Sequence, residues 1–345
     1  MVSASDVLLE HGTSDVGQRL LLGASNEAER GSPLMQALLL GAAADWSCGG
    51  VTREVLEPFR DEPAGQALHL RFAAALHRLV LDGAAPELAQ HYATVSGPKP
   101  PAEVWPAARR ALTAQPSLVS GLAALACQTN EIGRCLPLLA GLLHVSGLTG
   151  RPLRLLEVGA SAGLNLNVDR YRYGDVFGPT DSPCRLPDPG FTATAPLQLV
   201  GRRGCDPRPL DACTEQGRLR LLSSVWGDQP ERFTRLQSAF TVAAAHPPEV
   251  EAAGGAEWLA RQLASAADTP TVVWHSVVKT YVAAGEWQRI EELCNEHSVW
   301  RLGYEPEPSA LDSSTWLRLH GPGQDPDGAV LARGGGHGHP LTLGC

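Results

Sequence analysis

One short segment constrains the fold more than any other part of the sequence. Residues 153–158 are an apolar run that follows Pro152 and leads into a turn of small residues, Gly159-Ala-Ser161-Ala-Gly163. An apolar run of this length before a glycine-containing turn is typical of a buried parallel strand. Backbone N–H groups at such a turn can meet a ligand above the carboxyl end of the strand. The segment therefore predicts a doubly wound α/β domain with a ligand at this edge.

Two hydrophobic patterns divide the chain. From Ser32 to about Gly147, apolar residues recur at helical spacing and are interrupted by Gly and Pro. After Gly150, short apolar runs alternate with helical stretches, the pattern of a parallel sheet covered on both faces. We therefore expect a helical N-terminal domain over 1–150 and an α/β domain over 151–345. The expected strands are 153–158, 197–203, 219–226, 271–278, 299–304, 316–320 and 329–331, and the expected helices of this half are 230–245, 257–267 and 286–297.

Composition excludes several classes of protein. A hydrophobic fraction of 43% in 345 residues is that of an ordinary globular protein. The formal charge of −9, with almost no lysine and singly scattered arginines, gives no basic stripe for nucleic acid. The sequence contains no run of about 18 uncharged apolar residues, so we predict no membrane span, and the N-terminus lacks the pattern of a signal peptide. The eight cysteines form no Cys-x-x-Cys pair. We expect a cytoplasmic protein with a small-molecule substrate, and leave open a protein partner or a homo-oligomer.

The glycine-containing turn has two interpretations as a site. In the first, Gly159, Ser161 and Gly163 allow close approach of a cofactor or anion, and Glu157 on the preceding strand is its polar anchor. In the second, the turn is only a tight connection between strand and helix.

The same turn also matches the Gly-x-Ser-x-Gly nucleophile elbow of α/β-hydrolases, with Ser161 as nucleophile. An acid and a histidine would have to follow, and Asp228, Asp312, His337 and His339 stand in that order. Against this alternative, about 150 residues of helical pattern precede the turn, and no His-Gly-Gly oxyanion motif lies upstream.

Two polar groups in the helical half are candidates for chemistry. Asp45 is a lone carboxylate in an apolar helical stretch, suited to taking a proton from an amine or hydroxyl; otherwise it caps the end of that helix. Gln128, Asn130, Glu131 and Arg134 form a polar cluster, expected on a long helix that leads into the first strand. The cluster either lines a pocket above the sheet or is a buried hydrogen-bond network between the domains.

Further candidates follow later strands. His275 and Ser276 end the expected fourth strand, at the carboxyl edge of the sheet. His275 could act as a general base near neutral pH, or be a histidine hydrogen-bonded between strand and helix. Asp228 would contact an adenine or cap the helix that begins at Pro230. The pair His337 and His339 lacks a third and fourth ligand nearby, so we predict no metal site.

Five segments carry a resemblance to a known family: 128–134, 155–165, 204–211, 225–232 and 273–276. Over nearly its whole length the chain resembles a bacterial, largely actinobacterial family that is catalogued only as a domain of unknown function. The resemblance implies a class I S-adenosylmethionine methyltransferase-like, Rossmann-like core behind a helical N-terminal part. It also implies a tailoring role in secondary metabolism, with relatives tied to aziridine formation in azinomycin-type antibiotic pathways. Ser161 departs from the methyltransferase pattern, which has a middle glycine there, and Asp206 and Asp211 are the nearest candidates to hold the ribose.

The expected function is methyl transfer to a small polar metabolite, with S-adenosylmethionine as the implied cofactor. One alternative is intramolecular displacement without that cofactor, an aziridine-type ring closure with loss of sulfate or phosphate; a module that binds a partner without catalysis is another. The candidate bases are Asp45, Glu131 and His275. The candidate cofactor contacts are Glu157, Gly159, Ser161, Gly163, Asp206 and Asp228, and the candidate substrate contacts are Gln128, Asn130, Arg134, Asn165 and Ser276.

Overall fold

The computed structural model describes residues 15–191, 197–264, 268–307, 314–323 and 327–344, which form two compact units. The helical unit contains the chain up to Thr129 together with Leu219–Phe233, and the α/β unit contains Asn130–Arg218 and the chain from Thr234 onward. The division therefore lies at Thr129 instead of the expected 150. The reason is that α9 (Cys135–Thr149) packs on the sheet, where its Gly141 lies against Leu302.

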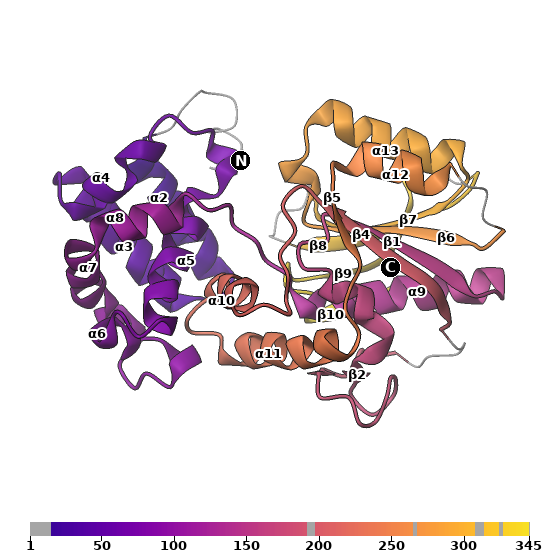
Figure 1. Ribbon diagram of the computed structural model, residues 1–345, viewed down its shortest axis with the longest axis horizontal. Coiled ribbons are helices and arrows are strands. Elements are labelled where there is room, and N and C mark those ends of the chain that lie inside the picture. Colours follow the sequence, from indigo (N-terminus) through magenta and orange to yellow (C-terminus); the bar gives the residue numbers. More distant parts are fainter. Residues whose placement is uncertain (1–14, 192–196, 265–267, 308–313, 324–326, 345) are drawn as a thin grey trace. The chain divides into compact units, whose positions relative to one another are not determined.

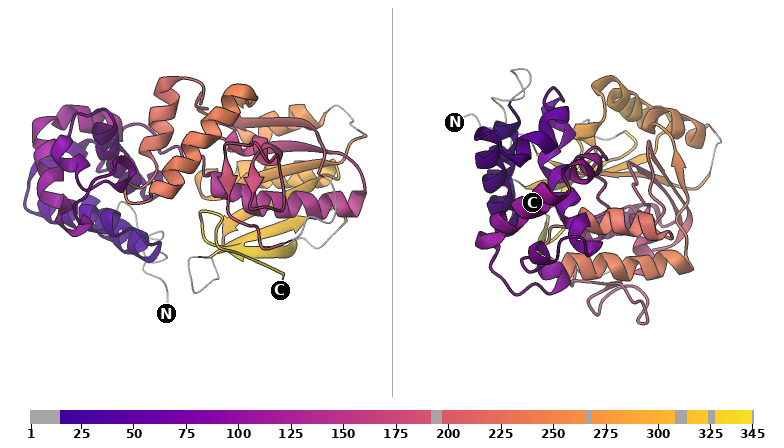
Figure 2. Two further views of the ribbon diagram at one scale, coloured as in Figure 1. Left: turned by 90° about the horizontal axis from the view of Figure 1, so that it is seen from below. Right: turned by 60° about the vertical axis from the view of Figure 1, so that its left-hand side comes forward.

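The helical unit consists of short helices around one apolar core, with no strand among its described residues (indigo to purple in Figures 1 and 2). Its first long pair, α2 and α3, packs closely, and Ser32 caps α3 by accepting a hydrogen bond from the Met35 N–H, with Pro33 at the first helical position. The elements are α2 (Val16–Glu29), α3 (Pro33–Ser47), α4 (Val51–Leu56), η1 (Glu57–Phe59), η2 (Ala64–Gln66), α5 (Leu68–Leu81), α6 (Pro86–Ala89), η3 (Ala93–Val95), η4 (Pro101–Glu103), α7 (Val104–Ala114) and α8 (Pro116–Ala123).

The segment Leu219–Phe233 is held in the helical unit by its own contacts. Trp226 is buried in the helical core. The His77 ring, also buried, donates from Nδ1 to the Val225 carbonyl at 2.8 Å, and burial lowers the pKa of His77 to about 4. Asp228 accepts hydrogen bonds from the Ser32 hydroxyl and the Leu34 N–H. This returning segment is therefore part of the helical core.

An eight-stranded sheet forms the centre of the α/β unit. Its strand order is β10-β9-β8-β7-β6-β1-β4-β5; the five strands from β7 to β5 in this order are parallel, and β8, β9 and β10 continue the sheet antiparallel. The strands are β1 (Leu153–Val158), β4 (Leu199–Asp206), β5 (Val250–Ala252), β6 (Thr271–Ser276), β7 (Trp300–Pro306), β8 (Thr315–His320), β9 (Ala329–Gly334) and β10 (Leu341–Leu343), and β2 (Arg172–Tyr173) pairs with β3 (Arg185–Leu186) apart from the sheet.

Helices cover both faces of the parallel part of this sheet. Helices α12 and α13 lie over one face and α9 over the other (Figure 1). The first face carries a second apolar core, in which Leu156 and Val158 of β1 pack against Trp258 and Trp287. The remaining helices are η5 (Ile132–Arg134), η6 (Leu164–Arg170), α10 (Glu215–Ser223), α11 (Pro230–Ala245), α12 (Gly255–Leu263), η7 (Lys279–Tyr281) and α13 (Ala284–Glu296).

The mixed α/β class with a mostly parallel sheet is confirmed, and two sequence-based expectations about local structure are wrong. Residues 219–226, expected to be a strand, end helix α10 and continue into a loop; the apolar pattern there serves the helical core. Gln128, Asn130 and Glu131 lie in an extended segment, so the long helix expected through them begins only at Cys135. Strands β5 and β10, with three residues each, were not expected.

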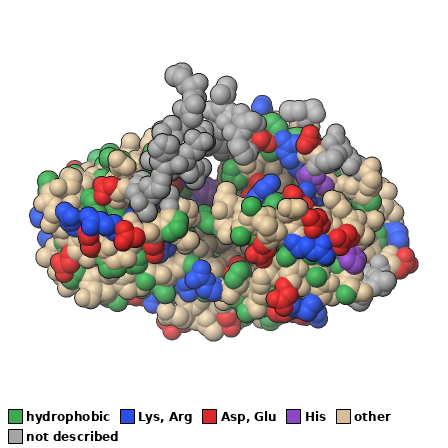
Figure 3. Space-filling model, turned by 90° about the horizontal axis from the view of Figure 1, so that it is seen from above, with side chains coloured by type: hydrophobic (Ala, Val, Ile, Leu, Met, Phe, Trp, Pro, Cys, Tyr) green, Lys and Arg blue, Asp and Glu red, His purple; other side chains and the backbone are tan. Residues whose placement is uncertain are grey.

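The distribution of charged and apolar residues in the structure agrees with what the composition predicts, namely no basic stripe and a globular protein. Figure 3 shows Lys and Arg interspersed with Asp and Glu on the face it presents. Within the described ranges one stretch, Ile132–Thr149, is long and apolar enough to cross a membrane, but 61% of it is buried within the structure. A core helix of a soluble protein has this property, so the structure is compatible with a soluble protein.

The contacts of Asp228 predict a stability effect. Replacing Asp228 with Ala removes the acceptor for the Ser32 hydroxyl and the Leu34 N–H, and we expect the free energy of unfolding to fall by about 1–3 kcal/mol. Urea denaturation followed by circular dichroism measures this change. Asp175→Asn, at a fully exposed side chain, is the matched control and should unfold like the wild type. Equal stability of Asp228→Ala and the control would show that these hydrogen bonds contribute nothing.

Candidate functional site

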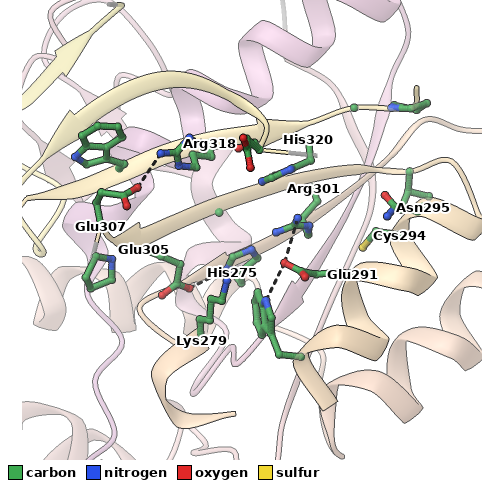
Figure 4. Close-up of a pocket in the computed structure, with 18 of the residues that line it drawn as sticks. His275, Lys279, Glu291, Cys294, Asn295, Arg301, Glu305, Glu307, Arg318 and His320 are labelled. Atoms are coloured by element: carbon green, nitrogen blue, oxygen red, sulfur yellow. Dashed lines mark hydrogen bonds and ion pairs between the residues drawn. The ribbon is translucent and has the colours of Figure 1, made fainter. Parts of the chain in front are cut away.

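A pocket of about 880 Å³ lies on the α/β unit, against the face of β6, β7 and β8 beside α13. Its volume is within the range of small-molecule sites. The alternating residues Arg301, Gly303 and Glu305 of β7 form its floor, with Arg318 and His320 from the next strand (Figure 4). A floor built from two neighbouring strands and a wall built from a helix hold these side chains in fixed positions.

His275 and Glu305 form a buried pair in this pocket. His275 is 2% exposed, and its Nδ1 lies 2.8 Å from Oε1 of Glu305. Because a carboxylate only accepts hydrogen bonds, Nδ1 carries the proton and Nε2 keeps its lone pair. That Nε2 is buried and has no hydrogen-bond partner among the described residues, and the same holds for Oε2 of Glu305. The pair has the arrangement of a carboxylate-oriented general base.

The backbone around His275 fixes the position of its ring. A Cβ added at Gly303 would lie 2.5 Å from Cε1 of the imidazole, so this strand position must be glycine for the ring to lie across it. Trp287 meets the ring edge-on at a centroid distance of 4.6 Å. The turn after β6 places Val277 at a φ of +50°, which is strained for a β-branched residue, and the next N–H, of Val278, donates to Glu305 at 3.2 Å.

Electrostatics keep His275 neutral. Burial lowers the pKa of its imidazole, and the positive charges of Arg301 and Lys279 lower it further, while Glu305 acts in the opposite direction. A neutral imidazole with a free Nε2 can accept a proton from a ligand O–H or N–H at neutral pH. The site therefore has the chemistry of general acid–base catalysis.

The other lining side chains make the pocket polar. Glu291 accepts from the indole N–H of Trp287 at 2.9 Å and pairs with Arg301 at 3.4 Å. Glu307 pairs with Arg318 at 2.7 Å, and the Arg318 guanidinium lies over Trp316. Sequence reasoning identified only His275 in this pocket. The charged residues of the floor stand at alternating positions on β7 and β8, a pattern that by itself predicts only a solvated sheet face, and the rest come from η7, α13 and loops.

The N–H groups of the glycine-containing turn after β1 are hydrogen-bonded to acceptors of the protein itself, mostly at the end of β4. The N–H groups of Gly159 and Ala160 both donate to the Cys205 carbonyl at 2.9 Å, Ser161 donates to Asp206 at 3.0 Å, and Gly163 donates back to the Ala160 carbonyl. Ser161 is also buried. A cofactor cradle needs such groups free, so their arrangement favours the structural interpretation of the turn.

The space above the turn is also filled. A Cβ added at Gly159 would lie 2.4 Å from the Val278 side chain, and one at Gly163 would lie 2.5 Å from Val250. Asp206, at the end of β4, accepts from the N–H of Ser161 and of Arg208. The residues that would bind S-adenosylmethionine in this turn therefore do not fit that role.

Glu157 lies on the opposite face of the sheet from His275. It is register partner to Trp274, is 2% exposed, and its Oε1 accepts a 3.5 Å hydrogen bond from Asn165. Burial raises its pKa from the ordinary 4.5 to about 8, with Asn165 and the charge of Arg134 acting against the rise. Glu157 is thus mostly protonated at neutral pH, a poor anchor for an ammonium group.

Most of the remaining candidates in the α/β unit form a hydrogen-bond network near the same edge. Asn130 accepts from the Leu164 N–H at 2.9 Å, and Glu131 accepts from the Gly133 N–H at 3.0 Å. Arg134 donates to the carbonyls of Ser276 and Gly336. These contacts fasten the extended segment before α9 to the sheet edge, so they hold the edge together.

The candidates in the helical unit have structural partners. Asp45 is not a lone carboxylate in the structure. It accepts a hydrogen bond from the Thr52 N–H at 2.8 Å, which caps the start of α4, and another from the Arg109 guanidinium at 3.0 Å. Gln128 also belongs to this unit, whereas Glu131 and His275 belong to the other. Asp228 is bonded to Ser32, as described above.

The hydrolase triad is not assembled among the residues that the structure describes. Of the acids that could serve Ser161, Asp228 is engaged in the helical unit and Asp312 lies outside the described residues. Among the residues that the structure describes, no three His, Cys, Asp or Glu side chains gather as metal ligands would.

The buried carboxyl of Glu157 predicts a pH effect on stability. Its pKa is higher in the folded protein than in the unfolded chain, so its contribution is complete below pH 4.5 and is lost as the pH rises toward 8. We expect the wild type to lose about 1.4 kcal/mol per pH unit in this window relative to Glu157→Gln. Denaturation at pH 5 and pH 8 measures the difference. Glu257→Gln, at an exposed side chain, should follow the wild type, and parallel behaviour of Glu157→Gln would contradict the assignment.

The comparisons with known proteins identify one family. Residues 18–342 match the family model described as "Uncharacterized protein conserved in bacteria (DUF2332)". Searches of curated proteins and of solved structures find no match. Because the family model covers nearly the whole sequence, the chain belongs to this bacterial family of uncharacterised proteins.

Proposed function

We propose that this protein is an enzyme that acts on a small polar molecule by general acid–base catalysis, without S-adenosylmethionine, in the pocket beside α13. One observation carries the proposal: His275 is buried against Glu305, and its Nε2 has no hydrogen-bond partner among the described residues of an 880 Å³ pocket. An unpartnered buried nitrogen costs free energy that a ligand hydrogen bond would recover. Sites that hold such groups are often functional.

In the proposed reaction His275 takes a proton from an O–H or N–H of the substrate. Its Nε2 accepts the proton as the oxygen or nitrogen forms a bond to carbon, and the leaving group departs with its electron pair. Glu305 holds the ring and stabilises the imidazolium that forms. Displacement with loss of sulfate or phosphate, including ring closure of the aziridine type, belongs to this class of reaction and is consistent with a cytoplasmic tailoring enzyme.

A search for turnover tests the proposal. The purified protein is incubated with fractions of bacterial metabolites, and mass spectrometry follows their conversion. We expect His275→Gln to lower turnover by about 100-fold or more, because a general base contributes about 10²–10⁴. Glu305→Gln should lower it less and should lower the pKa of His275, observed by NMR of the imidazole, because the carboxylate raises that pKa.

The matched control for these variants is His297→Gln, at an exposed histidine after α13, which should turn over substrate at the wild-type rate. Undiminished turnover by His275→Gln would remove this residue from the mechanism. Absence of turnover by the wild type, together with stable capture of a second protein or a second copy, would favour the partner-binding module.

Methyl transfer from S-adenosylmethionine is a second candidate, favoured by the strand order. In the order β5-β4-β1-β6-β7, strands are added on one side of β1 up to β5 and then on its other side from β6 onward, so the topological switch point lies between β1 and β6. The neighbouring strand β4 ends in the acidic Asp206. The occupied N–H groups and the filled space of the turn argue against it, so no step is derived through this cofactor.

Calorimetric titration decides between the two candidates. With S-adenosylmethionine or S-adenosylhomocysteine at millimolar concentration we expect no binding heat. Micromolar binding, about −8 kcal/mol, that is lost in Gly159→Val would instead support methyl transfer, because a side chain at Gly159 blocks approach to the backbone. Gly65→Ala, at a glycine with open space around it in the helical unit, is the control for a change of glycine as such.

A further inference from the structure

The second polar anchor of the pocket is a lysine in a chain that has almost none. The sequence contains only Lys99 and Lys279. Lys279 lines the pocket from the start of η7, four residues after His275, and its side chain extends toward His275 (Figure 4). Its ammonium lies 5.5 Å from the centroid of the Trp287 ring. Lysine is a compact charge on a flexible stem, which suits binding of a ligand anion more than a fixed structural pair.

The charges around Lys279 leave its ammonium available. Of the four carboxylates that line the pocket, Glu291 pairs with Arg301 and Glu307 with Arg318, and Glu305 accepts a hydrogen bond from His275. The fourth is Asp327, which forms no ion pair with Lys279. In the described part of the chain no carboxylate lies within ion-pair distance of Lys279. Arg301 and Arg318 are paired with Glu291 and Glu307, whereas Lys279 is paired with no carboxylate among the described residues. Its ammonium is therefore the cation of the lining that an anionic ligand can meet directly, and the charges of Glu305 and Asp327 restrict the place of the anion to the neighbourhood of Lys279.

His275 supplies the second, independent observation. Its Nε2 is buried, lacks a partner and can only accept a hydrogen bond while the ring is neutral. A ligand that satisfies this atom must carry an O–H or N–H donor. A ligand that also meets Lys279 must carry a negatively charged group within the length of the pocket.

We propose that the pocket binds small hydroxy or amino acids in the broad sense: molecules whose anionic group, carboxylate or phosphate, pairs with Lys279 while a hydroxyl or amino group donates to Nε2 of His275. The identity of the donor rests on the proposed function, in which that same hydrogen is the one removed. The anionic group is a binding determinant, and Lys279 is a specificity residue that does not take part in the proton transfer.

Four three-carbon probes separate the two requirements. Glycerate and glycerol 3-phosphate carry both an anion and hydroxyls, propionate carries the anion alone, and glycerol carries hydroxyls alone. Dissociation constants are measured by NMR titration of the full chain. We expect both two-function probes to bind at least tenfold more tightly than propionate or glycerol, and the tighter of the two names the anionic group. Equal affinity of all four would overturn the proposal.

Substitution of the two lysines gives a matched pair. Lys279→Met keeps the apolar stem and should weaken glycerate and glycerol 3-phosphate at least tenfold while leaving glycerol unchanged. Lys99→Met, at an exposed position in the helical unit, should change no affinity. Loss of less than twofold in Lys279→Met would overturn the proposal. Because Lys279 is exposed, the variant is expected to keep the wild-type melting temperature, which is measured alongside.

Chemical labelling gives a second readout that needs no substitution. Acetylation by an amine-reactive ester, followed by peptide mass spectrometry, reports on Lys99 and Lys279 separately. Saturating glycerate or glycerol 3-phosphate should slow labelling of Lys279 at least fivefold and leave Lys99 unaffected. Equal labelling with and without these probes would overturn the proposal.

These results are separable from the test of the proposed function. If Lys279→Met retains affinity while His275→Gln abolishes turnover, the substrate class is wrong and the general base stands. If Lys279→Met loses affinity for the anionic probes while His275→Gln retains turnover, the anion site stands and the catalytic role of His275 is wrong.

Discussion

The α/β unit depends on the hydrogen bonds that tie the turn after β1 to the end of β4. Two successive N–H groups, of Gly159 and Ala160, converge on the Cys205 carbonyl, and the next one reaches the Asp206 carboxylate. These bonds join the two strands at the point where the chain must leave the sheet. This geometry requires positive φ angles at Gly159, Ser161 and Gly163, which glycine adopts readily and which cost conformational energy only at Ser161. A turn that satisfies its own donors makes a rigid edge and leaves little capacity for a ligand.

The candidate catalytic pocket of the α/β unit lies instead on the face of the sheet that α13 covers. Register places Glu157 and Trp274 on the face of α9, whereas His275 faces α13, so adjacent residues of one strand serve different environments. Burial keeps both titratable groups uncharged near neutral pH, the carboxyl by a raised pKa and the imidazole by a lowered one. The imidazole has a carboxylate partner and a pocket in front of it, which gives it the means to exchange a proton with a ligand.

Sequence patterns predicted the elements whose burial is uniform along their length. The apolar strand at 153–158 and the helix at 230–245 agree with β1 and α11, since each presents a strong local period. Residues 219–226 were misread because an apolar run shows that a segment is buried without showing in which core. The pocket could not be predicted beyond His275, because the register of β6 and β7 brings Arg301 and Glu305 beside His275, and the turn into η7 adds Lys279. Alternating charged residues on a strand predict an open face, and only the tertiary structure shows that α13 stands beside it.

The return of residues 219–233 into the helical core has a consequence for synthesis of the chain. The helical unit is interrupted after Thr129 and completed only at Phe233, about a hundred residues later. At 5–20 residues per second a ribosome needs roughly 5–20 s for that stretch. During this interval the nascent helices lack Trp226 and the groups that bond to His77 and Ser32. Their apolar surface stays incompletely covered at that stage, and the helical unit can reach its final packing only after β1 and β4 of the other unit have been synthesised.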